Sequence, residues 1–177
     1  YRMPVPYGNQ RTPTAQWTAT AAGACLVRAH GGQGVPVLSV TFGRVQDFAV
    51  HDINNMGAAM MPAAASTLLR YFSATGTSPQ DFDAIFTGDL GEVGTALLHE
   101  QMAKEGLPLD NHKDCGCLLY DTNSQNVQAG GSGAGCSAAV LCGKILPMLG
   151  AGQLRRVLFL ATGALMRQTT FLQGESI

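Results

Sequence analysis

Residues 82–90 read FDAIFTGDL, and this stretch decides the fold class. Its apolar run at 84–87 ends in Gly88 and Asp89, and a helical pattern from about 92 to 105 follows. A short apolar strand that leads through a glycine turn into a helix is typical of α/β proteins, whose parallel strands are buried on both faces. The stretch therefore predicts a buried strand and, at its end, a turn on the sheet edge where such proteins bind ligands.

The same alternation extends on both sides of this unit. Apolar residues at helical spacing predict further helices at 56–73 and 136–149. The predicted strands, with a turn at 30–34 between the first two, lie at 24–29, 37–45, 84–87, 117–120 and 156–162. The sequence thus predicts an α/β fold with one layered, mostly parallel sheet. Because residues 138–141 make the last helix apolar on nearly every side, we expect that helix to be buried along its length.

Composition excludes several functional classes. Of the 177 residues, 46% are apolar and 13% are charged, and the net charge of −1 leaves no basic stripe for nucleic acid or anionic lipid. No stretch reaches the roughly 18 consecutive apolar residues that a transmembrane helix needs, and no signal peptide is visible. The five cysteines predict mostly buried thiols in a reducing compartment. The chain does not begin with methionine, so we expect a fragment of a longer protein.

Three short motifs resemble known sites but lack a required residue. The His-Glu pair at 99–100 would need a second histidine to bind zinc as a metalloprotease does, and Ala103 stands in its place. The Gly-Lys pair at 143–144 resembles the end of a phosphate-binding loop, but Ile145 replaces the Ser or Thr that binds magnesium. The stretch HKDCGC at 112–117 lacks the second ligand pair of a zinc site. We therefore expect no metal site.

A glycine-rich stretch, AGGSGAG at 129–135, precedes the helix that begins at Cys136. A dinucleotide fingerprint would place glycine at that position, so the motif fails. Two interpretations stay open: the glycines present bare N–H groups and the positive end of a helix to an anion, or they only let the helix pack closely on the sheet. Cys136 is the strongest candidate nucleophile. Because no histidine lies near it in the sequence, a small buried apolar side chain is the favoured interpretation.

The combination of these motifs resembles the stage V sporulation protein AD family. Several motifs are unusual together, and they follow one another with the family's order and similar spacing over nearly the whole chain. The stretches that carry the resemblance are 56–60, 62–65, 82–90, 114–116, 129–133, 161–165 and 173–177. One departure is minor: Ala134 stands where a cysteine is common in the family.

The resemblance implies a thiolase-like fold, which consists of two duplicated halves. Residues 1–50 would be the end of the N-terminal half, with its last two strands, and residues 51–177 an incomplete C-terminal half. Ketoacyl synthases of this fold carry a catalytic histidine after the strand equivalent to 84–87 and a catalytic asparagine in the glycine-rich turn. This chain has Gly-Asp at 88–89 and Gly-Ser at 131–132 instead. An ionised aspartate only accepts hydrogen bonds, so it cannot stabilise an enolate oxyanion as the histidine does.

The family's role implies a function. The family takes part in the uptake of dipicolinic acid (pyridine-2,6-dicarboxylate) into the spore. The resemblance therefore implies a non-catalytic binding protein that is intracellular and peripheral at the spore inner membrane, and that acts with membrane transport proteins of sporulation. The alternative is a thiolase-like enzyme that condenses acyl-CoA substrates. No cofactor is expected, and the ligand would bind either free or as its calcium chelate. Apolar surface and unpaired strand edges left by the absent half predict aggregation or a homodimer.

The expected ligand site lies where the two turns converge beyond the carboxyl ends of adjacent strands. No catalytic residue is expected there. An ionised Asp89 would repel a free carboxylate at close range, so we expect it to act through a bridging cation. The candidate binding residues are Gly88, Asp89, Gly131, Ser132, Gly133 and Cys136.

Overall fold

A computed structural model describes residues 12–29, 32, 34–164 and 166–177. Residues 1–16 are rich in Pro, Gly, Asn and Gln, and this composition predicts a loop. Most of that loop, and most of the turn expected at 30–34, lies outside the described residues. Within the described part of the chain, no helix has the length and apolar character needed to cross a bilayer.

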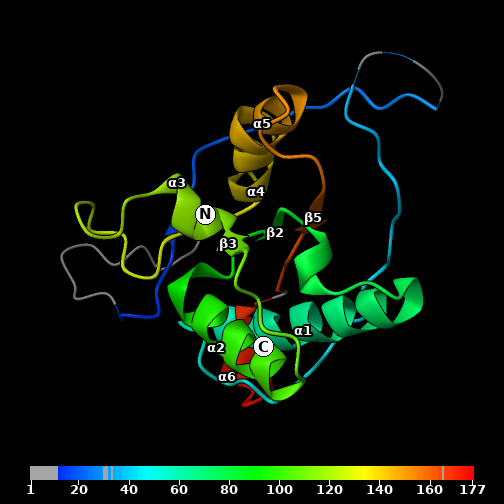
Figure 1. Cartoon of the computed structure of the whole chain (residues 1–177). Coiled ribbons are helices and arrows are strands. Elements are labelled where there is room, and N and C mark those ends of the chain that lie inside the picture. Colours follow the sequence, from blue (N-terminus) through cyan, green and yellow to red (C-terminus); the bar gives the residue numbers. More distant parts are fainter. Residues whose placement is uncertain (1–11, 30–31, 33, 165) are drawn as a thin grey trace.

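Two small parallel sheets form the framework of the molecule (Figure 1). The larger sheet has the strand order β3-β2-β5, with β3 at His112–Asp114, β2 at Ala84–Thr87 and β5 at Val157–Leu160. The smaller sheet pairs β1 (Trp17–Thr18) with β4 (Gly131–Ser132). The strands predicted at 84–87 and 156–162 are therefore confirmed, as is the α/β fold class with parallel sheets.

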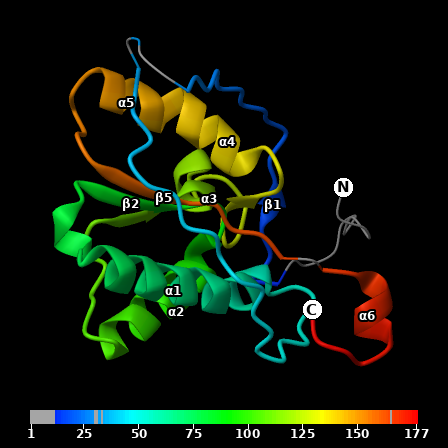
Figure 2. The ribbon, with the colours of Figure 1, turned by 90° about the vertical axis from the view of Figure 1, so that its right-hand side faces the viewer.

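Alternate residues of the central strand β2 face two different hydrophobic cores. Ile85 packs against α1 (Met56–Thr75) and α2 (Gly91–Lys104). Phe86 packs against the helix that runs from 136 to 150. Figures 1 and 2 show these helices on opposite sides of the larger sheet. All four residues of β2 are buried, which explains why Ala84, Ile85 and Phe86 are apolar in succession rather than alternating with polar residues.

α1 begins and ends at residues suited to those positions. The Asn55 side chain accepts a hydrogen bond from the backbone N–H of Ala58 (3.1 Å) and caps the helix. Gly76 ends it in the left-handed conformation, with φ of 63°. The helix packs closely on α2 where Gly57 meets Gly94, because a Cβ on Gly57 would lie 2.7 Å from the Gly94 nitrogen. Both predicted helices of this layer are confirmed.

The helix from 136 to 150 is continuous but not uniform. It consists of α4 (Cys136–Val140), a π-helical turn η2 (Leu141–Ile145) and α5 (Leu146–Gly150). Pro147 has no N–H to donate to the carbonyl four residues before it, which favours the wider π turn. The expectation that this helix is buried along its length is wrong, because only Cys136, Val140 and Ile145 are buried. These three residues form the stripe that faces the sheet, and the other side of the helix is half-buried or exposed.

The strands predicted at 24–29 and 37–45 are wrong, because neither segment forms a strand in its described residues. The first follows Gly23, which lies against the helix at 136–150: a Cβ there would be 2.4 Å from the Ala138 carbonyl oxygen. The second runs along α1, where the hydroxyl oxygens of Ser39 and Tyr71 are 3.0 Å apart. A strand needs a hydrogen-bonded neighbour, which side-chain propensity alone does not provide.

The strand predicted at 117–120 is also wrong. The segment holds the short helix α3 (Cys115–Leu119), because the Asp114 carboxylate accepts hydrogen bonds from the N–H groups of Gly116 and Cys117 and caps it. Three of the five predicted strands are therefore absent, and the strands that do form are divided between two sheets. The predicted single five-stranded sheet does not form. The remaining short elements are η1 (Pro79–Asp81) and α6 (Gln168–Leu172). The division of the chain at residue 50 stays a prediction.

Candidate functional site

Three loops that follow strands meet at the side chain of Asp89. One carboxylate oxygen, Oδ2, accepts a hydrogen bond from the backbone N–H of Gly133 (2.9 Å). The other, Oδ1, accepts one from the Thr162 hydroxyl (3.0 Å), and the Asp89 N–H donates back to the same hydroxyl oxygen (3.0 Å). We call Asp89, Gly133 and Thr162 the Asp89 junction. It joins the residues after β2, β4 and β5, so the predicted convergence of the two turns is found in the structure.

Glycine is required on both sides of the Asp89 junction. Gly133 has φ of 104°, a conformation that other residues rarely adopt. Gly88 lies so close to the loop after β5 that a Cβ would be 2.7 Å from Oγ1 of Thr162. The contact at Gly88 explains why glycine, rather than a bulkier residue, stands between the strand and Asp89.

The glycine-rich stretch is more ordered than a flexible turn with bare N–H groups. Gly131 and Ser132 are buried in β4, and the Ala19 N–H donates to the Ser132 carbonyl (2.7 Å). The Gln16 side-chain amide donates to the carbonyls of both Asp89 (2.8 Å) and Gly131 (3.1 Å), which ties β1 to the same corner. The Gly133 N–H, expected as an anion donor, is already occupied by the carboxylate of Asp89.

Cys136 lies directly behind this corner but is not activated as a nucleophile. Its side chain is fully buried. Burial, together with the nearby negative charges of Asp89 and Asp114, raises the pKa of its thiol to about 12. The thiol therefore keeps its proton at neutral pH, which supports the interpretation of Cys136 as a small apolar side chain.

A second carboxylate, Asp114, organises the neighbouring corner. Its Oδ1 accepts hydrogen bonds from the Thr87 hydroxyl (2.6 Å) and the Leu90 N–H (2.9 Å). Its Oδ2 accepts from the backbone N–H groups at the start of two helices: Gly91 in α2 (3.0 Å), and Gly116 (2.9 Å) and Cys117 (3.3 Å) in α3. The residue is almost fully buried. Asp114 thus connects the end of β2 to the first turns of α2 and α3.

Sequence reasoning missed this role of Asp114, although a signal was present. An aspartate followed by small residues, as in Asp-Cys-Gly-Cys at 114–117, is typical of a helix N-cap. The histidine and the two cysteines of the stretch at 112–117 also resemble part of a zinc site, and this resemblance drew attention away from the cap. Among the residues that the structure describes, no group of three or more His, Cys, Asp or Glu side chains could hold a metal ion.

The neighbouring histidines form a hydrogen-bonded chain that ends at Asp114. His112 Nε2 lies 2.8 Å from the Thr87 hydroxyl oxygen, and His112 Nδ1 lies 2.9 Å from His99 Nε2. Since Thr87 donates its proton to Asp114, His112 must donate through Nε2 and accept through Nδ1. Burial, followed by the charge of His99, lowers the pKa of His112 to about 4. His112 is therefore neutral at physiological pH.

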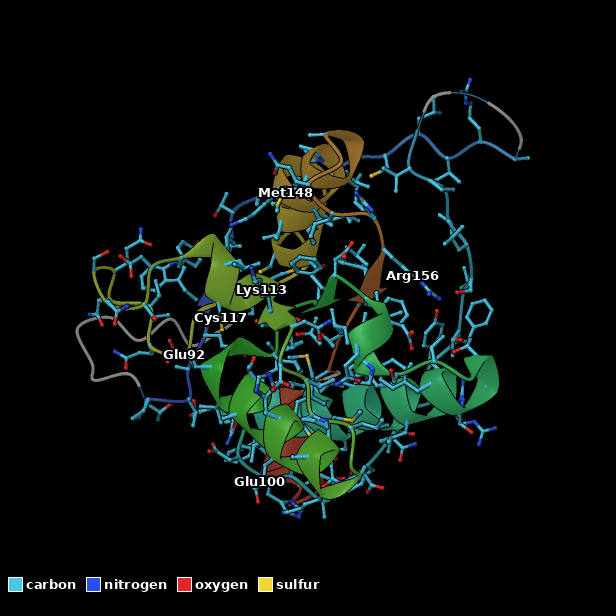
Figure 3. The ribbon with its side chains drawn as sticks, in the orientation of Figure 1. Glu92, Glu100, Lys113, Cys117, Met148 and Arg156 are labelled. Carbon is cyan, nitrogen blue, oxygen red and sulfur yellow. The ribbon has the colours of Figure 1, made fainter. Side chains whose placement is uncertain are left out.

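Cys117 belongs to α3 and lies at the same corner, where its backbone N–H donates to Oδ2 of Asp114. Figure 3 labels it beside Glu92, where α3 approaches the beginning of α2. Burial raises the pKa of Cys117 to about 12, and the charges of Asp114 and Glu92 act in the same direction. Burial likewise raises the pKa of Cys115. None of the three cysteines at 115, 117 and 136 is therefore a reactive thiolate at neutral pH.

An open hollow of about 340 Å³ lies beside the smaller sheet. It is lined by Trp17, Tyr120, Gln125, Asn126 and Val127. It adjoins the glycine-rich stretch, because a Cβ on Gly131 would be 2.9 Å from the Tyr120 ring. The hollow contributes two aromatic faces and two side-chain amides next to the corner described above.

Comparisons with known proteins agree on one family. The family model described as Stage V sporulation protein AD (SpoVAD) matches residues 1–177. The chain is 40% identical over 178 residues to Stage V sporulation protein AD of Bacillus subtilis (strain 168), in an alignment that covers all of this chain and 52% of that protein. The chain therefore spans about half the length of this curated relative.

Proposed function

Because the chain belongs to the stage V sporulation protein AD family, we propose that it forms part of a non-catalytic binding site for dipicolinic acid. The site lies at the Asp89 junction and the adjoining glycine-rich stretch. In this proposal the whole protein takes up the ligand at the spore inner membrane together with membrane transport partners. Both the ligand and this location come from the family resemblance.

The observation that carries the proposal is the meeting of three strand-end loops at Asp89. Gly133 and Thr162 both donate to its carboxylate, at 2.9 and 3.0 Å. Ligands of α/β proteins bind beyond the carboxyl ends of the strands, and this corner presents a backbone N–H and a hydroxyl that already hold a carboxylate. The corner is therefore chemically suited to the carboxylates of a small aromatic diacid.

The occupied Gly133 N–H limits how a diacid reaches this corner. A ligand carboxylate must either displace the Asp89 carboxylate or share a cation with it, since two anions repel at close range. The calcium chelate of dipicolinic acid would supply such a cation. Asp89→Asn keeps the shape of the side chain but removes its charge, so it distinguishes these two routes.

The absence of condensing activity is supported by the residues at this corner. Gly88 and Asp89 stand where condensing relatives carry a histidine, and the buried Asp89 carboxylate accepts hydrogen bonds rather than donating them. The pKa of Cys136 is raised to about 12, so this thiol is not a nucleophile at neutral pH. Turnover of a labelled acyl-CoA by the full-length protein would contradict this part of the proposal.

The decisive experiment is calorimetric titration of the full-length protein with dipicolinate, with and without calcium. Gly131→Val should abolish binding, because its side chain would meet the Tyr120 ring and deform β4. Gly143→Val is the matched control, since a Cβ there meets nothing within 4 Å. If a bridging cation is used, Asp89→Asn should weaken binding only when calcium is present. Unchanged affinity in both the Gly131 and Asp89 variants would place the ligand elsewhere.

A further inference from the structure

Two cysteines that the proposed site does not use lie side by side although they are 117 positions apart in the sequence. Cys25 Sγ and Cys142 Sγ are 3.3 Å apart. Cys25 is exposed and Cys142 is half-buried, whereas Cys115 and Cys136 are fully buried. The pair therefore departs from the expectation of mostly buried, inert thiols.

The chain brings these thiols together through close backbone contacts between the segment at 19–29 and the helix at 136–150. A Cβ on Gly23 would be 2.9 Å from Cys142 Sγ, and a Cβ on Gly135 would be 1.8 Å from the Ala21 carbonyl oxygen. Both contacts therefore require glycine. Cys142 lies in the π-helical turn η2, and such turns are frequent at functional sites.

We propose that Cys25 and Cys142 form a reversible disulfide that fastens the segment at 19–29 to the helix at 136–150. A disulfide needs sulfur atoms about 2.05 Å apart, so the thiols must approach by little more than an ångström. The segment at 19–29 can make this movement, because no strand pairing holds its backbone after Ala19.

The two thiols differ in a way that assigns them separate roles. The Cys142 thiol donates toward the Ala24 carbonyl oxygen (3.8 Å), and its hydrogen bond to Cys25 raises its pKa. Cys25 is the sulfur that solvent and small molecules reach. Cys25 is therefore the attacking thiol, and Cys142 is the resolving thiol.

The reaction is exchange with a low-molecular-weight disulfide. The Cys25 thiolate attacks one sulfur of that disulfide, its S–S bond breaks, and a mixed disulfide forms as the first thiol leaves. Cys142 then loses its proton and attacks Cys25 Sγ, and the second thiol leaves. The two cysteine protons end on the two released thiols. The cysteine pair is oxidised by two electrons, and the external disulfide is reduced.

The oxidised link would act on the corner that holds the candidate site. Ala21 contacts Gly135, which directly precedes the helix. Gly133 of the Asp89 junction lies two residues before Gly135. Fixing residues 19–29 therefore restrains the strand β1 that precedes them and the glycine-rich stretch that β1 pairs with. Amide hydrogen exchange of residues 20–29 should slow on oxidation and recover on reduction.

The proposal is tested by incubating the full-length protein with oxidised glutathione and then alkylating the remaining thiols for peptide mass spectrometry. The expected product is a peptide pair linked through Cys25 and Cys142, lighter by two hydrogen atoms and released by dithiothreitol. Cys142→Ser should stop the reaction at a glutathione adduct on Cys25, and Cys25→Ser should leave Cys142 free. Cys117→Ser is the matched control and should leave the link intact.

Three outcomes would overturn the inference. Alkylation of both Cys25 and Cys142 after oxidation would show that the link does not form. A stable glutathione adduct on Cys25 in the unmodified protein would show that Cys142 does not resolve it. A link between two molecules, recognised by a dimer on non-reducing gels, would place the partner thiol in another copy.

Discussion

At the scale of single residues, the buried Asp114 carboxylate offers a sharp test of the structure. It accepts five hydrogen bonds, from the Thr87 hydroxyl and from four backbone N–H groups. Asp114→Asn would turn an amide donor toward some of these donors, so we expect a loss of about 3 kcal/mol in the free energy of unfolding. Urea denaturation measures this loss of stability. Asp110→Asn, at an exposed aspartate nearby, should change stability by no more than about 0.5 kcal/mol, and an equal loss in both variants would contradict the role given to Asp114.

His112 predicts how stability depends on pH. Its pKa is lowered from 6.5 to about 4 in the folded protein, so between these values the unfolded state binds a proton that the folded state does not. Stability should therefore be full above pH 6.5 and fall as pH decreases toward 4, by about 2 kcal/mol between pH 7 and pH 5. Protonation at Nδ1 would also remove the acceptor for His99 Nε2. Urea denaturation at several pH values measures this slope.

His112→Gln supplies the control for that slope. Glutamine keeps a donor for the Thr87 hydroxyl but does not titrate. The variant should be less stable at pH 7 and should lose most of the decline toward pH 5. If its stability declined with the same slope as that of the unmodified protein, another group would be responsible.

At the scale of elements, the first helix depends on its cap. Asn55 accepts a hydrogen bond from the Ala58 N–H at 3.1 Å. Asn55→Ala should reduce the free energy of unfolding by about 1 kcal/mol, because this helical N–H loses its partner. Asn54→Ala is the matched control, since Asn54 is exposed and lies outside the helix. Equal midpoints for the two variants in urea denaturation would contradict the assigned cap.

The observed helices and strands also show which sequence signals were sufficient to predict an element. The strand at 84–87 and the helices that pack on it were predictable, because local periodicity and burial on both faces agree there. The segments at 24–29 and 37–45 have strand propensity without a strand to pair with. The prediction at 117–120 failed because the single carboxylate of Asp114 starts a helix there, and a run of apolar residues does not reveal such a cap.

The candidate site was predictable in position but not in its bonding. The convergence of residues 88–89 with the glycine-rich stretch follows from parallel strand order. That Asp89 takes up the Gly133 N–H, and that Thr162 completes the junction, depends on contacts between residues 44 and 73 positions apart. Spacing in the sequence carries no information on such contacts. For the same reason the sequence did not indicate that Cys25 and Cys142 meet.

At the scale of the whole molecule, the described structure has one unusually apolar surface. Most of its exposed large apolar side chains lie between residues 26 and 48, in the long segment that passes from the helix at 136–150 to α1 in Figures 1 and 2. They include Val45 (98% exposed), Leu26 (89%) and Phe42 (84%). In the described residues of this segment, the backbone also lacks strand partners. Apolar side chains on unpaired extended backbone favour pairing with another chain.

We therefore expect the 177-residue chain to self-associate through the segment at 26–48. Sedimentation equilibrium should give a mass above 18.5 kDa that rises with concentration. The double variant Val40→Lys and Phe42→Lys places two charges on one side of the extended segment and should shift the mass toward the monomer, because edge lysines oppose strand pairing. Leu172→Lys is the control, because it also replaces an exposed apolar side chain (78% exposed) with a charged one. Leu172 lies in α6, outside the segment, so this variant should leave association unchanged. A concentration-independent monomer in the unmodified chain would mean that this apolar segment does not pair with a second copy.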